Sequence, residues 1–295
     1  MNLLQRIEAS AQALTAARLA FGHGTTNARD EATWLVLWAL GLPLDTPMEG
    51  EASQAQRSLS VAELAKVDAL ITQRIVTRRP AAYLTHEAWL QGFSFYVDER
   101  VIIPRSLIAE LLVDGGIDYW LQTTTRAVLD LCTGNRSLAV IAASVYPDVT
   151  VDAADISQDA LDVARINIDR HGLEQRIALL ACDGLKHLSA SYDLILCNPP
   201  YVNARSMGNL PPEYRAEPMI ALDGNQSGGT DGMDFIRTLL QDVPRHMHPG
   251  AVLVLEIGNE RPFFEAAFPT LEVVWLETSA GEDQVLLITR EALNP

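Results

Sequence analysis

From residue 126 onward, short apolar runs alternate with longer stretches in which apolar residues recur at helical spacing. The short runs are rich in Val, Ile and Leu, so they predict strands. These runs are residues 127–132, 149–154, 177–181, 192–197, 252–257, 272–276 and 284–289, and the helical stretches are 137–146, 157–171, 231–246 and 260–267. The alternation predicts an α/β domain whose sheet is mostly parallel and is covered on both faces. The last two runs are separated by a short polar segment, which predicts an antiparallel hairpin.

The N-terminal part of the chain has a different pattern. Residues 1–82 show helical periodicity, and residues 83–105 alternate aromatic and β-branched residues around Gly92, as in a hairpin. We therefore expect a helical N-terminal domain at 1–82, a hairpin linker at 83–105 and the α/β domain at 106–295. The α/β domain is predicted to begin with a helix that ends near Leu121.

Composition narrows the class of protein. The chain has 295 residues, 48% of them hydrophobic, which is enough for one large domain and a smaller one. No apolar run approaches the ~18 residues of a membrane helix, and the first residues do not resemble a secretory signal. Three cysteines without close spacing argue against a zinc site or a disulfide framework, so we expect buried thiols in a reducing cytoplasm. The cysteines are Cys132, Cys182 and Cys197.

The net charge of −16 weighs against a nucleic-acid surface, which normally carries a basic patch. The same charge suits a basic protein partner through long-range attraction.

Polar residues follow the first three predicted strands. Asp130 lies near the end of the first run, and Gly134 follows that run and precedes a helix. Asp155 directly follows the second run, and Asp183 follows the third. A glycine before a helix N-terminus lets the backbone approach a ligand. A carboxylate at the second tip suits the two hydroxyls of a ribose, and one at the third suits an exocyclic amine of adenine. Each acid alone could instead be an N-cap of the next helix, but polar tips on four strands in order favour a nucleoside cofactor.

The fourth strand runs directly into Asn198-Pro199-Pro200-Tyr201. The two prolines stiffen the turn and leave its carbonyl groups free to accept hydrogen bonds. The Asn198 side chain adds another acceptor, and Tyr201 adds a flat ring. This set suits a planar NH2 group held still beside an electrophile. A nucleoside cofactor next to such a turn predicts methyl transfer from S-adenosylmethionine to nitrogen.

The segments DLCTG, DAADIS, CDGL and NPPY, in this order and spacing, resemble the N(5)-glutamine protein methyltransferases. The resemblance covers nearly the whole chain from about residue 25. It implies a Rossmann-like, seven-stranded class I S-adenosylmethionine-dependent methyltransferase domain, preceded by a small helical domain. Residues 103–110 (IPRSLIAE) and 210–218 (LPPEYRAEP) are similar to the branch that acts on a large-subunit ribosomal protein, number three. That substrate is basic and suits the charge.

The resemblance implies a role for each matching residue. Asn198 and the Pro199 carbonyl would accept the hydrogens of the glutamine amide, with Pro200 stiffening the turn and Tyr201 packed on the amide plane. Hydrogen bonds that pyramidalise the nitrogen, with in-line approach to the methyl group, would supply the rate, and no dedicated base is required. The implied cofactor-binding residues are Asp130, Thr133, Gly134, Asp155, Ile156, Asp183 and Asn198.

One position departs from the family pattern. Arg136 stands where the second glycine of the cofactor loop belongs. If the position needs a positive φ or close contact with the cofactor, a side chain there is costly or blocking. Arg136 could instead point to solvent or pair with the cofactor carboxylate. Residues 224–229 also look longer than usual and are predicted to be a surface insertion. The long loop 198–230 is predicted to be a functional lid or a substrate-docking segment. Glu217 matches a family segment, and we assign it no role beyond the structure of this lid.

Three other functions compete with this one. A release-factor glutamine would require the same chemistry on another protein. Adenine-N6 methylation of DNA would also use the NPPY turn, but the acidic charge argues against it. A chain whose cofactor loop is closed by Arg136 would be a non-catalytic binding or assembly factor.

Overall fold

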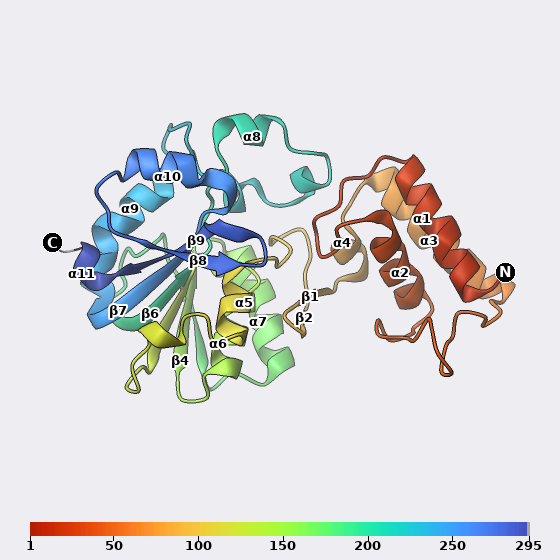
Figure 1. Cartoon of the computed structure of the whole chain (residues 1–295), viewed down its shortest axis with the longest axis horizontal. Coiled ribbons are helices and arrows are strands. Elements are labelled where there is room, and N and C mark those ends of the chain that lie inside the picture. Colours follow the sequence, from red (N-terminus) through yellow and green to blue (C-terminus); the bar gives the residue numbers. More distant parts are fainter. Residues whose placement is uncertain (294–295) are drawn as a thin grey trace. The chain divides into compact units, whose positions relative to one another are not determined.

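The computed structural model describes residues 1–293, and these form two compact units (Figure 1). The first unit contains residues 1–88 and the short segment 211–216, and the second contains residues 89–210 and 217 onward. The segment 211–216 therefore belongs to the first unit although the residues on both sides of it belong to the second.

The first unit is helical. Its helices are α1 (Leu3–Ala16), α2 (Ala28–Ala39), α3 (Val61–Thr77) and α4 (Ala81–Thr85), with the turn η2 (Tyr214–Ala216). Its interior contains Glu31, Glu213 and Arg74, and the partly exposed Arg78 lies beside them. Arg74 donates to Glu31 at 2.8 Å and lies 3.9 Å from Glu213, which also pairs with Arg78 at 2.7 Å. Glu213 is buried, so this paired charge attaches the segment 211–216 to the helices.

The second unit begins with the two-stranded sheet β1 (Ala88–Leu90) and β2 (Phe93–Phe95), which forms the predicted hairpin around Gly92. The main sheet contains β3 (Ala127–Leu131), β4 (Thr150–Asp155), β5 (Ile177–Ala181), β6 (Tyr192–Cys197), β7 (Met247–Glu256), β8 (Val274–Thr278) and β9 (Gly281–Thr289). Its helices are α5 (Ile108–Val113), α6 (Ser137–Val145), α7 (Gln158–His171), α8 (Ala204–Gly208), α9 (Asp234–Asp242), α10 (Arg261–Ala267) and α11 (Arg290–Leu293). Short 3-10 turns lie at Asp118–Trp120, Met219–Ala221, Val243–His246 and Gly258–Glu260.

The strand order of the main sheet is β5-β4-β3-β6-β7-β9-β8. Strands β3 to β7 run parallel, and β9 is antiparallel to both β7 and β8. Buried residues of α5 and α6 pack on one face of the sheet, and those of α9 and α10 pack on the other (Figure 1). The predicted α/β class, the mostly parallel sheet and the terminal hairpin are confirmed.

Two predicted boundaries differ most from those in the structure. The helix predicted to end near Leu121 ends at Val113, because Gly115 has a positive φ of 71° and a second glycine follows it. Strand β7 begins at Met247, five residues before its predicted start at 252, although its first residues include a proline and a glycine. Pairing with β6 at Tyr192 and Met247 accounts for this extension.

Candidate active site

The carboxyl ends of β5, β4, β3 and β6 lie next to one another, because these four strands are parallel and adjacent. The strand order reverses between β3 and β6, which is where open α/β sheets bind ligands. A pocket opens at this edge. The predicted residues in its wall are Asp130, Thr133, Gly134, Asp155, Ile156, Asp183, Asn198 and Pro200, whereas Pro199 and Tyr201 lie outside the wall.

Asp130 has one engaged carboxylate oxygen and one that is not. Its Oδ2 accepts the Thr133 hydroxyl and, at 3.0 Å, the Ala139 N–H, which ties β3 to the start of α6. Its Oδ1 is buried and has no hydrogen-bond partner among residues 1–293. Burial raises the pKa of Asp130 to about 6. A buried acceptor without a partner is costly, so this oxygen is suited to a ligand cation such as an ammonium group.

Asn135 is a pocket residue that the sequence analysis missed. Its Oδ1 accepts the Ser137 N–H at 3.3 Å, and its backbone carbonyl accepts Asn167 Nδ2 at 2.9 Å. Its Nδ2 is buried and finds no acceptor within the described part of the chain. The pocket wall therefore offers an unused acceptor on Asp130 and an unused donor on Asn135. An α-amino acid group, with its ammonium and carboxylate, complements both.

Arg136 has a left-handed backbone conformation, with a φ of 74°, which glycine adopts more readily than other residues. Its side chain is fully buried and lies outside the pocket wall. The guanidinium donates to the carbonyl of Ala178 at 3.0 Å and to that of Ala153 at 3.5 Å, in β5 and β4. Burial lowers the pKa of Arg136 to about 10. The predicted solvent-facing side chain is wrong, because the side chain is fully buried and its Nη2 donates to the β4–β5 backbone. Pairing with the cofactor carboxylate stays a prediction, since Nε and Nη1 have no hydrogen-bond partner within residues 1–293. The loop is open.

Asp155 joins the tips of β3 and β4. Its Oδ2 accepts the Gly134 N–H and its Oδ1 the Ser157 N–H, both at 2.9 Å. Burial raises the pKa of its carboxyl group. Each oxygen keeps capacity for a further hydrogen bond, so the carboxylate can accept two ligand hydroxyls.

The outer part of the pocket has apolar walls and one acid. Ile156 is 56% exposed and lies in the wall together with Phe235, an apolar side chain that the sequence analysis missed. Asp183 is exposed and pairs with Lys186 at 2.5 Å. The wall therefore suits a flat, partly polar ring. Lys186, which the sequence analysis did not mention, forms an ion pair with the Asp183 carboxylate.

The turn 198–201 is held from two sides. The Tyr201 ring lies against Gly258, where an added Cβ would be 2.7 Å from ring atom Cε2. The Tyr201 carbonyl lies against Gly232, where an added Cβ would be 2.0 Å from the carbonyl oxygen. Burial and the nearby Glu256 carboxylate raise the pKa of Tyr201. Two glycines thus allow other backbone segments to pack directly against Tyr201.

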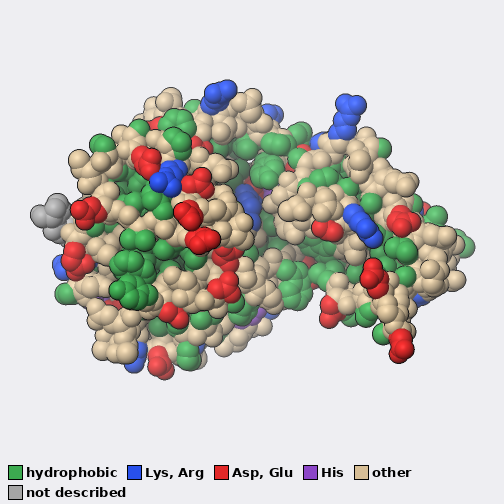
Figure 2. All heavy atoms as spheres, viewed as in Figure 1, with side chains coloured by type: hydrophobic (Ala, Val, Ile, Leu, Met, Phe, Trp, Pro, Cys, Tyr) green, Lys and Arg blue, Asp and Glu red, His purple; other side chains and the backbone are tan. Residues whose placement is uncertain are grey.

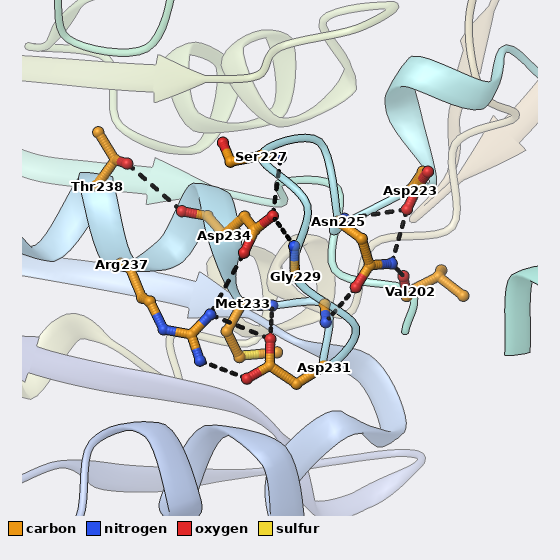
Figure 3. Close-up of polar contacts among 11 residues, drawn as sticks. Val202, Asp223, Asn225, Ser227, Gly229, Asp231, Met233, Asp234, Arg237 and Thr238 are labelled. Carbon is orange, nitrogen blue, oxygen red and sulfur yellow. Dashed lines mark hydrogen bonds and ion pairs between the residues drawn. The ribbon is translucent and has the colours of Figure 1, made fainter. Parts of the chain in front are cut away.

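The loop that follows the turn returns to it through a network of hydrogen bonds (Figure 3). Asn225 Nδ2 donates to the Val202 carbonyl at 3.0 Å, and its Oδ1 accepts the Gly232 N–H at 2.8 Å. At the start of α9, Asp234 accepts the N–H groups of Ser227 and Gly229 at 2.8 and 2.9 Å. The surface insertion predicted at 224–229 is therefore only partly a surface feature. Gly224 is buried, and Asn225 fixes the residue after Tyr201.

Glu217 supports the wall of the pocket. Its carboxylate accepts two hydrogen bonds from Arg105, at 2.6 and 2.8 Å, and one from the Ile103 N–H at 2.9 Å. Pro218, Ile220, Ala221 and Gln226, which follow it, line the pocket together with Arg105. The paired, buried Glu217 therefore fixes the base of this loop to residues 103–105.

The three cysteines are unpaired in the described structure. Only Cys197 is buried, and the expectation of burial is wrong for Cys132 and Cys182, which lie in the pocket wall because they stand at strand tips. Within residues 1–293, no group of three or more His, Cys, Asp or Glu side chains is placed to hold a metal ion. In the same part of the chain, no helix is both long and apolar enough to cross a membrane.

Residues 111–210 match the sequence model of the methyltransferase small domain. The ribosomal protein uL3 glutamine methyltransferase of Bordetella pertussis is 50% identical and aligns over 95% of this chain and 92% of its own length. The chain belongs to the ribosomal protein uL3 glutamine methyltransferase family. The member from Bradyrhizobium diazoefficiens is 44% identical over 100% of this chain and 92% of its own. The predicted resemblance to the ribosomal-protein branch of the glutamine methyltransferases is confirmed.

The fold of this methyltransferase family member also resembles distant solved structures. The catalytic domain of human Mettl16, in complex with MAT2A 3′UTR hairpin 6, is 13% identical with a TM-score of 0.52. The alignment covers 77% of this chain and 81% of that one. A sequence identity of 13% supports similarity of the fold alone.

Proposed function

We propose that this chain transfers a methyl group from S-adenosylmethionine to the side-chain amide nitrogen of a glutamine in large-subunit ribosomal protein uL3. One observation carries the proposal: the Asn198 turn lies at the same sheet edge as a pocket with an unused acceptor, Asp130 Oδ1, and an unused donor, Asn135 Nδ2. The relatives named for this activity align over nearly the whole chain.

The pocket residues fit each part of S-adenosylmethionine. Asp130 would hold the ammonium group and Asn135 the carboxylate of the methionine part. Asp155 would accept the ribose hydroxyls, and Ile156 and Phe235 would lie on the faces of the adenine. When bound, the cofactor supplies a methyl group on a positively charged sulfur. Thr133, Gly134 and Asp183 complete the wall.

The turn would orient the glutamine. Asn198 Oδ1 and the Pro199 carbonyl would accept the two amide hydrogens, and the Tyr201 ring would lie on the amide plane. An amide nitrogen is a poor nucleophile because its lone pair is delocalised, so hydrogen bonds that favour a pyramidal nitrogen accelerate attack. Fixing the nitrogen in line with the methyl group supplies the rest of the rate.

The charge of the chain supports a basic substrate. On the face of the described residues drawn in Figure 2, acidic side chains are spread over the second unit, and the basic ones do not gather into a patch. With a net charge of −16, the chain attracts a basic ribosomal protein and repels nucleic acid. We propose that the helical domain at 1–82 docks the substrate and that 83–105 is the linker to the catalytic domain.

Calorimetric titration of S-adenosylmethionine tests the cofactor site. We expect micromolar binding to the unmodified chain, and similar binding to Arg136→Gly, because Arg136 lies outside the pocket wall. Binding that appears only in Arg136→Gly would contradict the proposal and favour a non-catalytic binding factor. Methyl transfer to uL3, to a release factor and to DNA, measured in parallel, tests the substrate, and only uL3 should be modified.

A further inference from the structure

Ser106 and Glu256 form a buried pair beside the candidate active site. The Ser106 hydroxyl donates to Glu256 Oε2 at 2.5 Å, although 150 positions separate the two residues. Ser106 is 5% exposed and lies in the pocket wall, and Glu256 is 4% exposed. Neither residue has a role in holding the cofactor or the amide as proposed above.

The pair lies next to the Asn198 turn. Strands β6 and β7 are parallel neighbours, with Cys197 opposite Leu255. Asn198 directly follows β6 and Glu256 is the last residue of β7, so the two lie at the same sheet edge. The charge of Glu256 also acts on Tyr201. A carboxylate is therefore close to the residues that would hold the glutamine amide.

The reaction releases a proton at this place. When the amide nitrogen bonds to the methyl carbon and the carbon–sulfur bond breaks, the nitrogen carries a positive charge until it loses a hydrogen. Asn198 Oδ1 and the Pro199 carbonyl are amide oxygens, which orient the hydrogens but are poor proton acceptors. The Ser106 hydroxyl donates to Glu256 and accepts the Ile108 N–H at 3.3 Å. A hydroxyl oxygen has two lone pairs, so Ser106 keeps one for the pocket that it lines.

The family resemblance leaves the amide proton to depart without a dedicated base. We propose instead that Ser106 and Glu256 relay this proton during methyl transfer, a proposal that rests on the function proposed above. The N–H proton of the methylated amide passes to Ser106 Oγ while the Ser106 hydroxyl proton passes to Glu256. The products are the neutral N-methyl amide, S-adenosylhomocysteine and a protonated Glu256, which returns its proton to solvent when the products leave.

Several charged and polar groups surround this acid. The N–H groups of Leu107 and Ile108 and the guanidinium of Arg105 favour its ionised form, but burial dominates and raises the pKa of Glu256 to about 7. Tyr201 lies nearby and is itself influenced by the carboxylates of Glu217 and Glu260. Since the relay requires ionised Glu256, we expect methyl transfer to accelerate as the pH rises through about 7.

Glu256 also has a structural role, because it accepts the Leu107 N–H at 2.9 Å at the start of α5. Glu256→Gln separates the two roles, since a glutamine oxygen still accepts from Leu107 and Ser106 but does not take up a proton at neutral pH. Ser106→Ala removes the hydroxyl, and Ser106→Thr retains it. Ser144→Ala, on α6 and outside the pocket wall, is the matched control.

The experiment measures single-turnover methyl transfer to uL3 at saturating cofactor, from about pH 6 to about pH 9, with S-adenosylmethionine affinity measured by calorimetry. Glu256→Gln should slow transfer roughly a hundredfold, the low end for a general base, and should abolish the rise with pH. Cofactor affinity should be unchanged. Ser106→Ala should also slow transfer, and Ser106→Thr and Ser144→Ala should retain it.

Two outcomes would overturn the relay in different ways. If Glu256→Gln transfers within about threefold of the unmodified chain with the same pH profile, Glu256 only caps α5 and the relay is wrong. If the unmodified chain binds the cofactor but transfers no methyl group to uL3, the proposed function itself fails.

Discussion

Replacing Glu256 with glutamine should change the pH dependence of folding stability. The perturbation is small in volume, and the glutamine oxygen can keep the hydrogen bonds from Ser106 and Leu107. What it removes is a buried carboxyl group whose pKa is raised from 4.5 to about 7 by burial. A difference of this size corresponds to about 3 kcal/mol, at 1.36 kcal/mol for each pH unit.

The sign follows from proton binding. The folded chain holds the Glu256 proton more tightly than the unfolded chain does, so this proton stabilises the fold fully below about pH 4.5. This stabilisation is lost as the pH rises from about 4.5 to about 7. In this interval the unfolded chain is increasingly stabilised by ionisation of Glu256, whereas the folded chain still holds the proton. The Glu256→Gln variant has no carboxyl group at this position, so its stability does not fall for this reason. Relative to the unmodified chain, it should therefore gain about 3 kcal/mol across this interval.

Urea unfolding of both chains at a series of pH values measures this difference. The exposed pair of Glu265 with Arg261 offers the control variant Glu265→Gln, and we expect the difference for it to stay small at every pH. A Glu256→Gln difference that does not vary with pH, or that falls as the pH rises, would refute the description of Glu256 as a buried acid with a raised pKa.

Three further predictions concern other parts of the site. Asn135→Ala should weaken S-adenosylmethionine binding about tenfold and leave 5′-methylthioadenosine binding unchanged, because that ligand lacks the amino-acid group. Equal losses of affinity for the two ligands in calorimetry would contradict a role for Asn135 in holding the cofactor carboxylate. Asn225→Ala removes the hydrogen bond to the Val202 carbonyl and should lower kcat about tenfold, with cofactor affinity unchanged. A change in cofactor affinity alone would show that the loop around Asn225 does not act through the turn 198–201. Glu217→Ala leaves Arg105 and the Ile103 N–H without their carboxylate partner and should lower the free energy of unfolding in urea by about 3 kcal/mol. Glu217→Gln should lower it less, because the glutamine can still accept from Ile103, and equal losses for the two variants would contradict this role of Glu217.

The strand-tip residues could be predicted from the sequence because each follows directly after an apolar run. Asp130, Asp155 and Asn198 end or follow the parallel strands β3, β4 and β6, and parallel strands bring their carboxyl ends to one edge. A local pattern, read along the chain, was therefore enough to assemble most of the pocket wall.

The residues that the sequence analysis missed or misread depend on contacts between distant segments or on backbone angles. Ser106 and Glu256 are 150 positions apart, and no local pattern connects them. Arg136 has a φ of 74°, and its side chain reaches the backbone of β4 and β5. Neither the angle nor the contact is visible in the sequence. Glu217 shows its role only when Arg105, 112 positions away, is beside it.

The most direct test of the proposed activity is tandem mass spectrometry of purified uL3 after incubation with this chain and S-adenosylmethionine. We predict one added methyl group, located on the side-chain amide of a single glutamine, and its loss when Asn198→Ala replaces the unmodified chain. Unmodified uL3, under conditions in which calorimetry shows that the cofactor is bound, would contradict the assignment of this chain as a uL3 glutamine methyltransferase.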